Sequence, residues 1–143
     1  MPQVDFYILA DAAEQQRLHF ACRLVETAFK RGHRVYLHAA DDDAAQALDT
    51  LLWQFQSTSF VPHAMAGEDA AAPVLIGCRA VAADGCDVLI NTALAVPPEF
   101  ARFARVTEIV VQDPGVLRAT RNAWRFYQEQ GCSLHQHDLR RPQ

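Results

Sequence analysis

The sequence predicts an α/β fold with a mainly parallel sheet flanked by helices. Short apolar runs alternate with amphipathic segments along the whole chain, and strands that alternate with helices pair in parallel through crossover connections. The length of 143 residues corresponds to one domain. Half of the residues are hydrophobic and 21% are charged, which is ordinary globular composition. We therefore expect residues 1–143 to form a single domain.

The predicted strands are short apolar runs without helical periodicity. The segment VDFYIL at residues 4–9 is the first of them. Four others follow at residues 34–38, 73–76, 87–90 and 106–111, and a last edge strand is expected at 132–137.

The predicted helices are recognised by periodicity and by their end signals. In the helix over about 12–30, apolar residues recur at steps of four, three and four, at Leu18, Cys22, Val25 and Phe29. Gly32 caps the end of this helix. Asp41, Asp42 and Asp43 cap a helix that continues to about residue 52. A short helix is expected near 99–102, and a long one from Asp113-Pro114 to about 130, where Gly131 ends it. Residues 53–72 are expected to form a long loop.

The charge distribution argues against direct binding of nucleic acid. The net charge is −4 and the isoelectric point is about 5.8. Residues 1–101 carry 6 basic and 13 acidic side chains, which gives −7, whereas residues 102–143 carry 7 basic and 4 acidic ones, which gives +3. Binding of a phosphate backbone through the C-terminal arginines therefore remains only an alternative. The chain has no apolar run long enough for a membrane span and no secretory signal, so we expect a cytoplasmic protein.

The cysteines do not form a metal or disulfide pattern. They lie at positions 22, 78, 86 and 132 with no CxxC pair, and we expect buried free thiols. His135 and His137 alternate on one face of the last strand, which permits a metal pair but is more typical of exposed histidines. The sequence therefore predicts no metal and no cofactor.

Phosphate-binding signatures are missing from the sequence. Neither GxGxxG nor GxxxxGK[ST] occurs, and the turn after the first strand is Ala10-Asp11-Ala12-Ala13. We therefore expect a nucleotide-binding-like fold that lacks a phosphate-binding loop. One alternative is a small α/β enzyme that uses Cys86 or His63 in a cleft at the carboxyl ends of the strands.

The last long helix carries the most informative pattern. Arg118, Arg121 and Arg125 fall within about 60° of one another at 100° per residue. The core-facing arc lies opposite, and Trp124 lies at the boundary. That arc consists of Val116, Ala119, Thr120, Ala123 and Tyr127. The pattern fits a receptor for a ligand that is both acidic and apolar, or a solvated helix face with one aromatic residue at the edge of the core.

A second aromatic group lies in or beside the expected loop. The residues are Trp53, Phe55, Phe60, Pro62 and His63. Large apolar side chains at such a place either fold back on the core or form a partner surface.

These residues and several neighbouring segments resemble the chi subunit family of bacterial DNA polymerase III. The string W-x(6)-FVPH-x(2)-AGE at 53–68 is specific, and the other matching segments cover nearly the whole chain. They are FYIL at 6–9, RGHRV at 31–35, the ALD and LW pieces within 47–53, APV at 72–74, DVLIN at 87–91, EIV at 108–110 and the helix over 121–131.

The resemblance implies a non-catalytic replisome subunit with two protein partners. In the family, chi pairs with the psi subunit, which ties it to the clamp loader, and chi also grips the acidic C-terminal tail of single-stranded DNA-binding protein. Arg121, Trp124 and Arg125 fit the tail-binding pattern, with Val110 as a pocket wall and Arg118 as a loose match to a further basic position. The psi-facing positions are Trp53, Phe60, Pro62 and His63. Contact with single-stranded DNA is then expected only through the protein that coats it.

Overall fold

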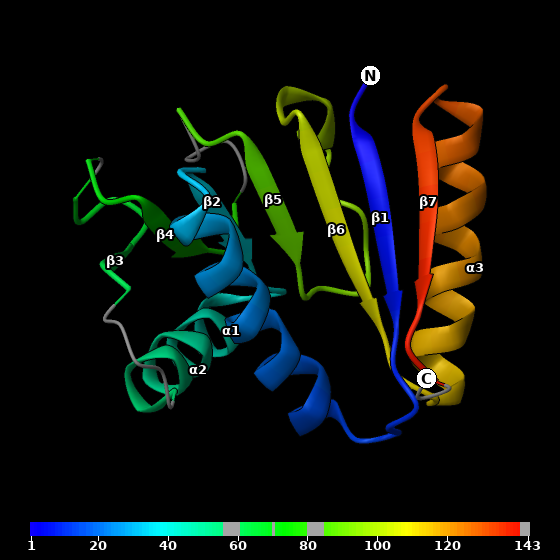
Figure 1. The fold of residues 1–143 in the computed structure, drawn as a ribbon, viewed down its shortest axis with the longest axis horizontal. Helices are drawn as coiled ribbons and strands as arrows, with labels where there is room; N and C mark the ends of the chain where they lie inside the picture. Colours follow the sequence, from blue (N-terminus) through cyan, green and yellow to red (C-terminus); the bar gives the residue numbers. More distant parts are fainter. Residues whose placement is uncertain (56–60, 70, 80–84, 141–143) are drawn as a thin grey trace.

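Seven parallel strands form one sheet in the parts of the chain that the computed structural model describes, which are residues 1–55, 61–69, 71–79 and 85–140. The strand order is β3-β4-β2-β5-β6-β1-β7 (Figure 1). The strands are β1 (Gln3–Ile8), β2 (Val35–His38), β3 (His63–Met65), β4 (Val74–Gly77), β5 (Val88–Asn91), β6 (Arg105–Val110) and β7 (Ser133–Asp138). The predicted α/β class with a mainly parallel sheet is confirmed.

The helices divide between the two faces of the sheet. Helices α1 (Glu14–Lys30) and α2 (Asp42–Gln54) lie together on one face, and α3 (Pro114–Glu129) lies on the other face, where it contacts β6 and β7 and is seen behind β7 in Figure 1. A short 3-10 helix, Phe100–Arg102, precedes β6. No helix in the described ranges is long and apolar enough to cross a membrane.

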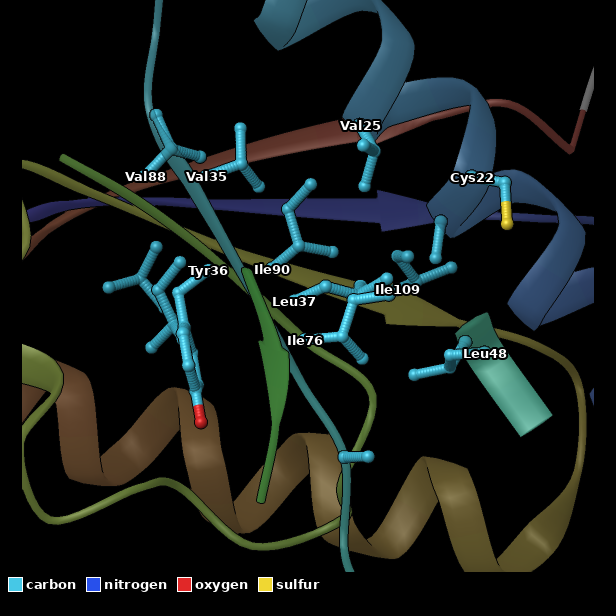
Figure 2. Packing of buried hydrophobic residues seen from close by; sticks show 14 of the residues in the cluster. Cys22, Val25, Val35, Tyr36, Leu37, Leu48, Ile76, Val88, Ile90 and Ile109 are labelled. Atoms are coloured by element: carbon cyan, nitrogen blue, oxygen red, sulfur yellow. The ribbon is translucent and has the colours of Figure 1, made fainter. Parts of the chain in front are cut away.

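The core is built on the central strands. Every residue of β2, β4 and β5 is buried, as the near-continuous Val, Leu and Ile runs of a parallel sheet covered on both faces require. Figure 2 shows the side chains of these strands meeting Cys22 and Val25 of α1 and Leu48 of α2. Tyr36 points to the opposite side, where its hydroxyl donates to the carbonyl oxygen of Arg79 at 2.7 Å. Packing of this kind is the main stabilising contribution to the fold.

The predicted end signals of the helices are confirmed. The Asp41 carboxylate accepts a hydrogen bond from the Ala44 amide at 2.7 Å. Gly32 and Gly131 follow α1 and α3 with φ of 85° and 84°, which side chains other than glycine rarely adopt. The predicted last edge strand is confirmed as β7, which pairs with β1.

Two predictions about local structure were wrong in part. The expected loop over 53–72 contains strand β3, which pairs in parallel with β4. On α1, the buried positions are Arg17, Ala21, Cys22 and Val25, while Leu18 and Phe29 are only half-buried. All four cysteines are free, as expected, but only Cys22 and Cys86 are buried.

Arg17 is a cation that the fold buries and uses as a cross-link. Its side chain is 2% exposed. Its Nε donates to the carbonyl oxygen of Ile109 at 3.0 Å, and its Nη1 donates to that of Thr92 at 2.9 Å and to the exposed Glu14 carboxylate at 2.9 Å. Arg17 thus ties α1 to the ends of β5 and β6, where two carbonyl groups would otherwise lack a donor.

Replacing this guanidinium by an apolar chain of similar length tests its role. Arg17→Met should lower the free energy of unfolding by about 3 kcal/mol, because two buried carbonyls lose charged donors worth roughly 1.5–3 kcal/mol each. Urea denaturation measures the change. The matched variant Arg23→Met, on the exposed face of α1, should shift stability by less than about 0.5 kcal/mol. Equal losses in both variants would contradict the cross-link.

Candidate peptide-binding site

Helix α3 begins at a well-defined cap just after β6. The Asp113 carboxylate accepts hydrogen bonds from the amides of Gly115 at 3.0 Å and Val116 at 3.1 Å. Pro114 occupies the first helical position, where its missing N–H would in any case be unpaired. The cap fixes where α3 starts, and therefore which side chains face the sheet and which face water.

One face of α3 packs on the sheet around an aromatic cluster. Val116, Ala123 and Tyr127 are buried, and Ala119 and Thr120 are half-buried, which confirms the predicted core-facing arc. The ring centroid of Phe6 on β1 lies 5.0 Å from that of Trp124 and 6.1 Å from that of Tyr127. These contacts leave Trp124 half-buried, so the predicted boundary position of its indole is confirmed.

The three predicted arginines lie on the exposed side of α3. Arg118, Arg121 and Arg125 are all exposed, and none forms an ion pair or hydrogen bond with another residue in the described ranges. Positive charge without internal partners, next to a half-buried indole, can receive a carboxylate and an apolar group together.

Val110 lies deeper than the other candidate residues of this site. It is the last residue of β6, pairs with Ile8 of β1, and is only 2% exposed. Two residues earlier on the same strand face, Glu108 contacts α3. The structure therefore groups Arg118, Arg121, Trp124 and Arg125 at the surface and places Val110 in the core, where a ligand reaches it only if neighbouring side chains move.

A buried carboxyl group anchors α3 to the sheet. The Tyr127 hydroxyl donates to Glu108 Oε2 at 2.6 Å, and the Asn91 amide donates to the same oxygen at 3.0 Å. Burial raises the pKa of Glu108 to about 7, although both hydrogen bonds and the charge of Arg17 act in the opposite direction. Burial and the contact with Glu108 raise the pKa of Tyr127 as well.

The second group of candidate residues lies at the opposite edge of the sheet. Trp53, near the end of α2, is 60% exposed, and its ring centroid lies 4.7 Å from that of His63, the first residue of β3. The His63 side chain is only 2% exposed, with Nδ1 donating to the Val61 carbonyl at 2.8 Å and Nε2 lying 3.5 Å from Asp49 Oδ1. The buried ring of His63 therefore packs against the exposed indole of Trp53. Pro62 is half-buried beside it, and Phe60 lies outside the described residues.

Comparison with known proteins identifies the family. The sequence model of the family described as DNA polymerase III chi subunit, HolC, matches residues 1–135. The DNA polymerase III subunit chi of Pseudomonas aeruginosa is 44% identical over 141 residues, which is 99% of each chain. The chain belongs to the DNA polymerase III chi subunit family. The subunits chi of Haemophilus influenzae and Escherichia coli are each 26% identical, over 90% and 94% of this chain and 92% and 97% of their own lengths.

Membership of the chi family makes the chain a subunit of DNA polymerase III that acts in DNA replication. The family is named for a component of the polymerase assembly and not for a reaction of its own. Membership of this assembly implies protein partners in the replisome.

The alternative prediction, an enzyme site with Cys86 or His63 at the carboxyl ends of the strands, is wrong about where these residues lie. Cys86 precedes β5 and His63 begins β3, so both lie at the amino ends of strands, whereas the predicted cleft was at the carboxyl ends. Two hollows, of about 370 and 650 Å³, lie at the carboxyl ends of strands, and neither Cys86 nor His63 is among the described residues that line them. Ala12 and Asp113 are among the residues that line the hollow of about 370 Å³.

Sequence reasoning missed the groups that hold the site in place. Phe6 and Glu108 position α3, and neither was singled out. A charged residue inside the apolar run over 106–111 was the available signal for Glu108, because a carboxyl group within a buried strand needs hydrogen-bond partners.

The anchoring carboxyl group makes stability depend on pH. The folded protein keeps the Glu108 proton up to a pH of about 7, whereas the unfolded chain releases it near 4.5, so stability falls as pH rises through this window. The contribution is on the order of 3 kcal/mol. In Glu108→Gln, one amide oxygen accepts both hydrogen bonds and no proton is lost, so this decline should disappear.

Urea unfolding at pH 5 and pH 8 tests this expectation. The free energy of unfolding of Glu108→Gln, relative to that of the wild type, should be higher at pH 8 than at pH 5. The control Glu129→Gln removes an exposed carboxylate from the same helix and should follow the wild-type profile. The same pH dependence in wild type and Glu108→Gln would refute the assignment.

Proposed function

We propose that this chain is a non-catalytic adaptor that joins the clamp loader, through the psi subunit, to single-stranded DNA-binding protein. In this proposal α3 grips the acidic C-terminal tail of that protein, and the surface around Trp53 receives psi. The observation that carries the proposal is the unpaired arginine face of α3 beside Trp124. The residues proposed for the tail are Arg118, Arg121, Trp124 and Arg125, with Val110 behind them.

The chemistry of the arginine face matches a tail that ends in Pro-Phe after a run of acidic residues. Burying the terminal phenyl group against Trp124 is worth roughly 2–3 kcal/mol. Each hydrogen bond from a guanidinium to a carboxylate contributes roughly 1.5–3 kcal/mol. Two or three such contacts, less the cost of ordering a flexible tail, give on the order of −8 kcal/mol, which is micromolar affinity.

The surface proposed for psi consists of Trp53, Pro62, His63 and Phe60, of which Phe60 lies outside the described residues. The indole of Trp53 is exposed and packs against His63, as is typical of an aromatic anchor residue at a protein interface. Exposed large apolar side chains gain most when a partner removes them from water.

The two proposed surfaces can be occupied at the same time. Strand β3 and strand β7 are the two edges of the sheet, and six spacings of about 4.8 Å separate them by roughly 29 Å. In this arrangement the chain meets single-stranded DNA only through the protein that coats it, in the cytoplasm, and the net charge of −4 agrees with the lack of direct contact.

Titration with a fluorescent acidic peptide ending in Asp-Ile-Pro-Phe tests the proposed site. We expect micromolar binding that weakens as salt rises, because the charges on α3 are exposed. Arg121→Ala and Trp124→Ala should each weaken binding by at least about tenfold, which corresponds to about 1.4 kcal/mol. A peptide that lacks the terminal Phe should not bind.

Arg31→Ala is the matched control, since it removes an exposed arginine that follows α1, the helix on the opposite face of the sheet. It should bind the peptide as the wild type does. Unchanged binding by a folded Arg121→Ala, Trp124→Ala double variant would rule out α3 as the tail site.

A further inference from the structure

An apolar groove runs along the flank of α3 that faces away from Trp124. It is formed by α3 and by the segment that follows β5, and it has a volume of about 500 Å³. Its walls include Leu94 and Val96 on one side and Ala119, Asn122 and Phe126 on the other. The α3 residues span two helical turns, so the groove is parallel to the helix.

A second hollow adjoins the groove at the segment that follows β5. Residues 94–96 also line this hollow, of about 650 Å³, which extends over Pro97 and Pro98 toward His38 and Arg79. The same short segment is therefore a wall of both hollows.

The walls of the groove present apolar surface to water. Leu94 is 54% exposed and Phe126 is 38% exposed, and they are two of the five large hydrophobic residues that are exposed in the described ranges. Large apolar side chains that face one groove together are typical of a docking surface.

The groove is preformed. The Phe126 ring lies edge-on to Phe100 with centroids 5.4 Å apart. On the opposite wall, the Asn91 side chain donates to the Ala95 carbonyl at 3.1 Å and accepts from the Ala93 amide at 3.0 Å. Because Asn91 also donates to Glu108, the same buried network that anchors α3 fixes the loop wall. A preformed groove lowers the entropic cost of binding.

The charges beside the groove favour an acidic occupant. Arg118 and Arg125 lie one turn before and one turn after Asn122, on the solvent side of the groove, and neither has an ion-pair partner in the described part of the chain. Of the carboxylates nearby, Glu99 lines the adjoining hollow, and Glu129 lies one turn after Arg125 on α3. The positive charge beside the groove therefore lies on α3, between Arg118 and Arg125.

We propose that this groove docks an acidic amphipathic helix of a protein partner. The apolar stripe of that helix packs against Leu94, Val96 and Phe126, and its carboxylates pair with Arg118 and Arg125. Helices that lie side by side pack at about 8–10 Å, which suits an occupant parallel to α3 with anchors at i, i+3, i+4 and i+7. The groove shares Arg118 and Arg125 with the proposed tail site, but its apolar wall is a different one, because Phe126 and Trp124 point about 160° apart on α3.

A designed peptide tests the proposal. The probe has about four helical turns, Leu or Phe at i, i+3, i+4 and i+7, Asp or Glu elsewhere, and both ends capped, so that it lacks the free terminal Phe required at the tail site. Fluorescence anisotropy should give a Kd in the range of tens of micromolar. Leu94→Asp should weaken binding by at least about tenfold, and Leu94→Met should retain it.

Two controls separate this groove from other surfaces. Leu139→Asp changes another exposed leucine, 47% exposed, and should bind as the wild type does. Trp124→Ala should also bind the capped probe, which separates failure of this proposal from failure of the tail site. Circular dichroism establishes that each variant is folded.

Three results would overturn the proposal. The first is equal binding of a scrambled probe with the same composition, which would mean attraction by charge alone. The second is unchanged binding by folded Leu94→Asp. The third is self-association of the wild type in sedimentation experiments that Leu94→Asp abolishes, which would make a second copy of the chain the occupant.

Discussion

The docking of α3 on the sheet determines every property of the surfaces that this helix presents. The Glu108 carboxyl group accepts hydrogen bonds from Tyr127 on α3 and from Asn91 on β5, and Phe6 packs against Trp124 from β1. These contacts fix the rotation of the helix about its axis. With that rotation fixed, the arginines face water, Trp124 lies at the boundary on one flank, and Phe126 lies in the groove on the other flank.

The all-parallel order of the sheet places the two proposed surfaces far apart in a small chain. The connection from β1 to β2 crosses over two intervening strands, and the chain returns through β6 to finish beside β1. Residues from the first half of the sequence therefore form the β3 edge, and the last third forms the β7 edge (Figure 1).

The sequence predicts what depends on neighbours along the chain and misses what depends on distant ones. Helix boundaries at Asp41, Gly32 and Gly131 follow from local capping, and the arginine face follows from periodicity. Arg17 is different, because the carbonyls that accept its hydrogen bonds lie 75 and 92 residues away. Strand β3 has only three half-buried residues, too few for a period-two signal. Hydrophobicity alone also cannot show that Val110 is buried below the surface that it was predicted to line.

The central claim is that two separate protein-binding surfaces occupy opposite edges of one sheet, and the chain provides its own reporters. It contains two tryptophans, Trp53 and Trp124, one in each proposed surface. Nuclear magnetic resonance of the two indole N–H groups, assigned with Trp53→Phe, follows both surfaces in one titration. We predict that the acidic tail peptide shifts the Trp124 signal alone and that psi shifts the Trp53 signal alone. A shift of Trp53 by the tail peptide, with Trp124 unmoved, would contradict the account.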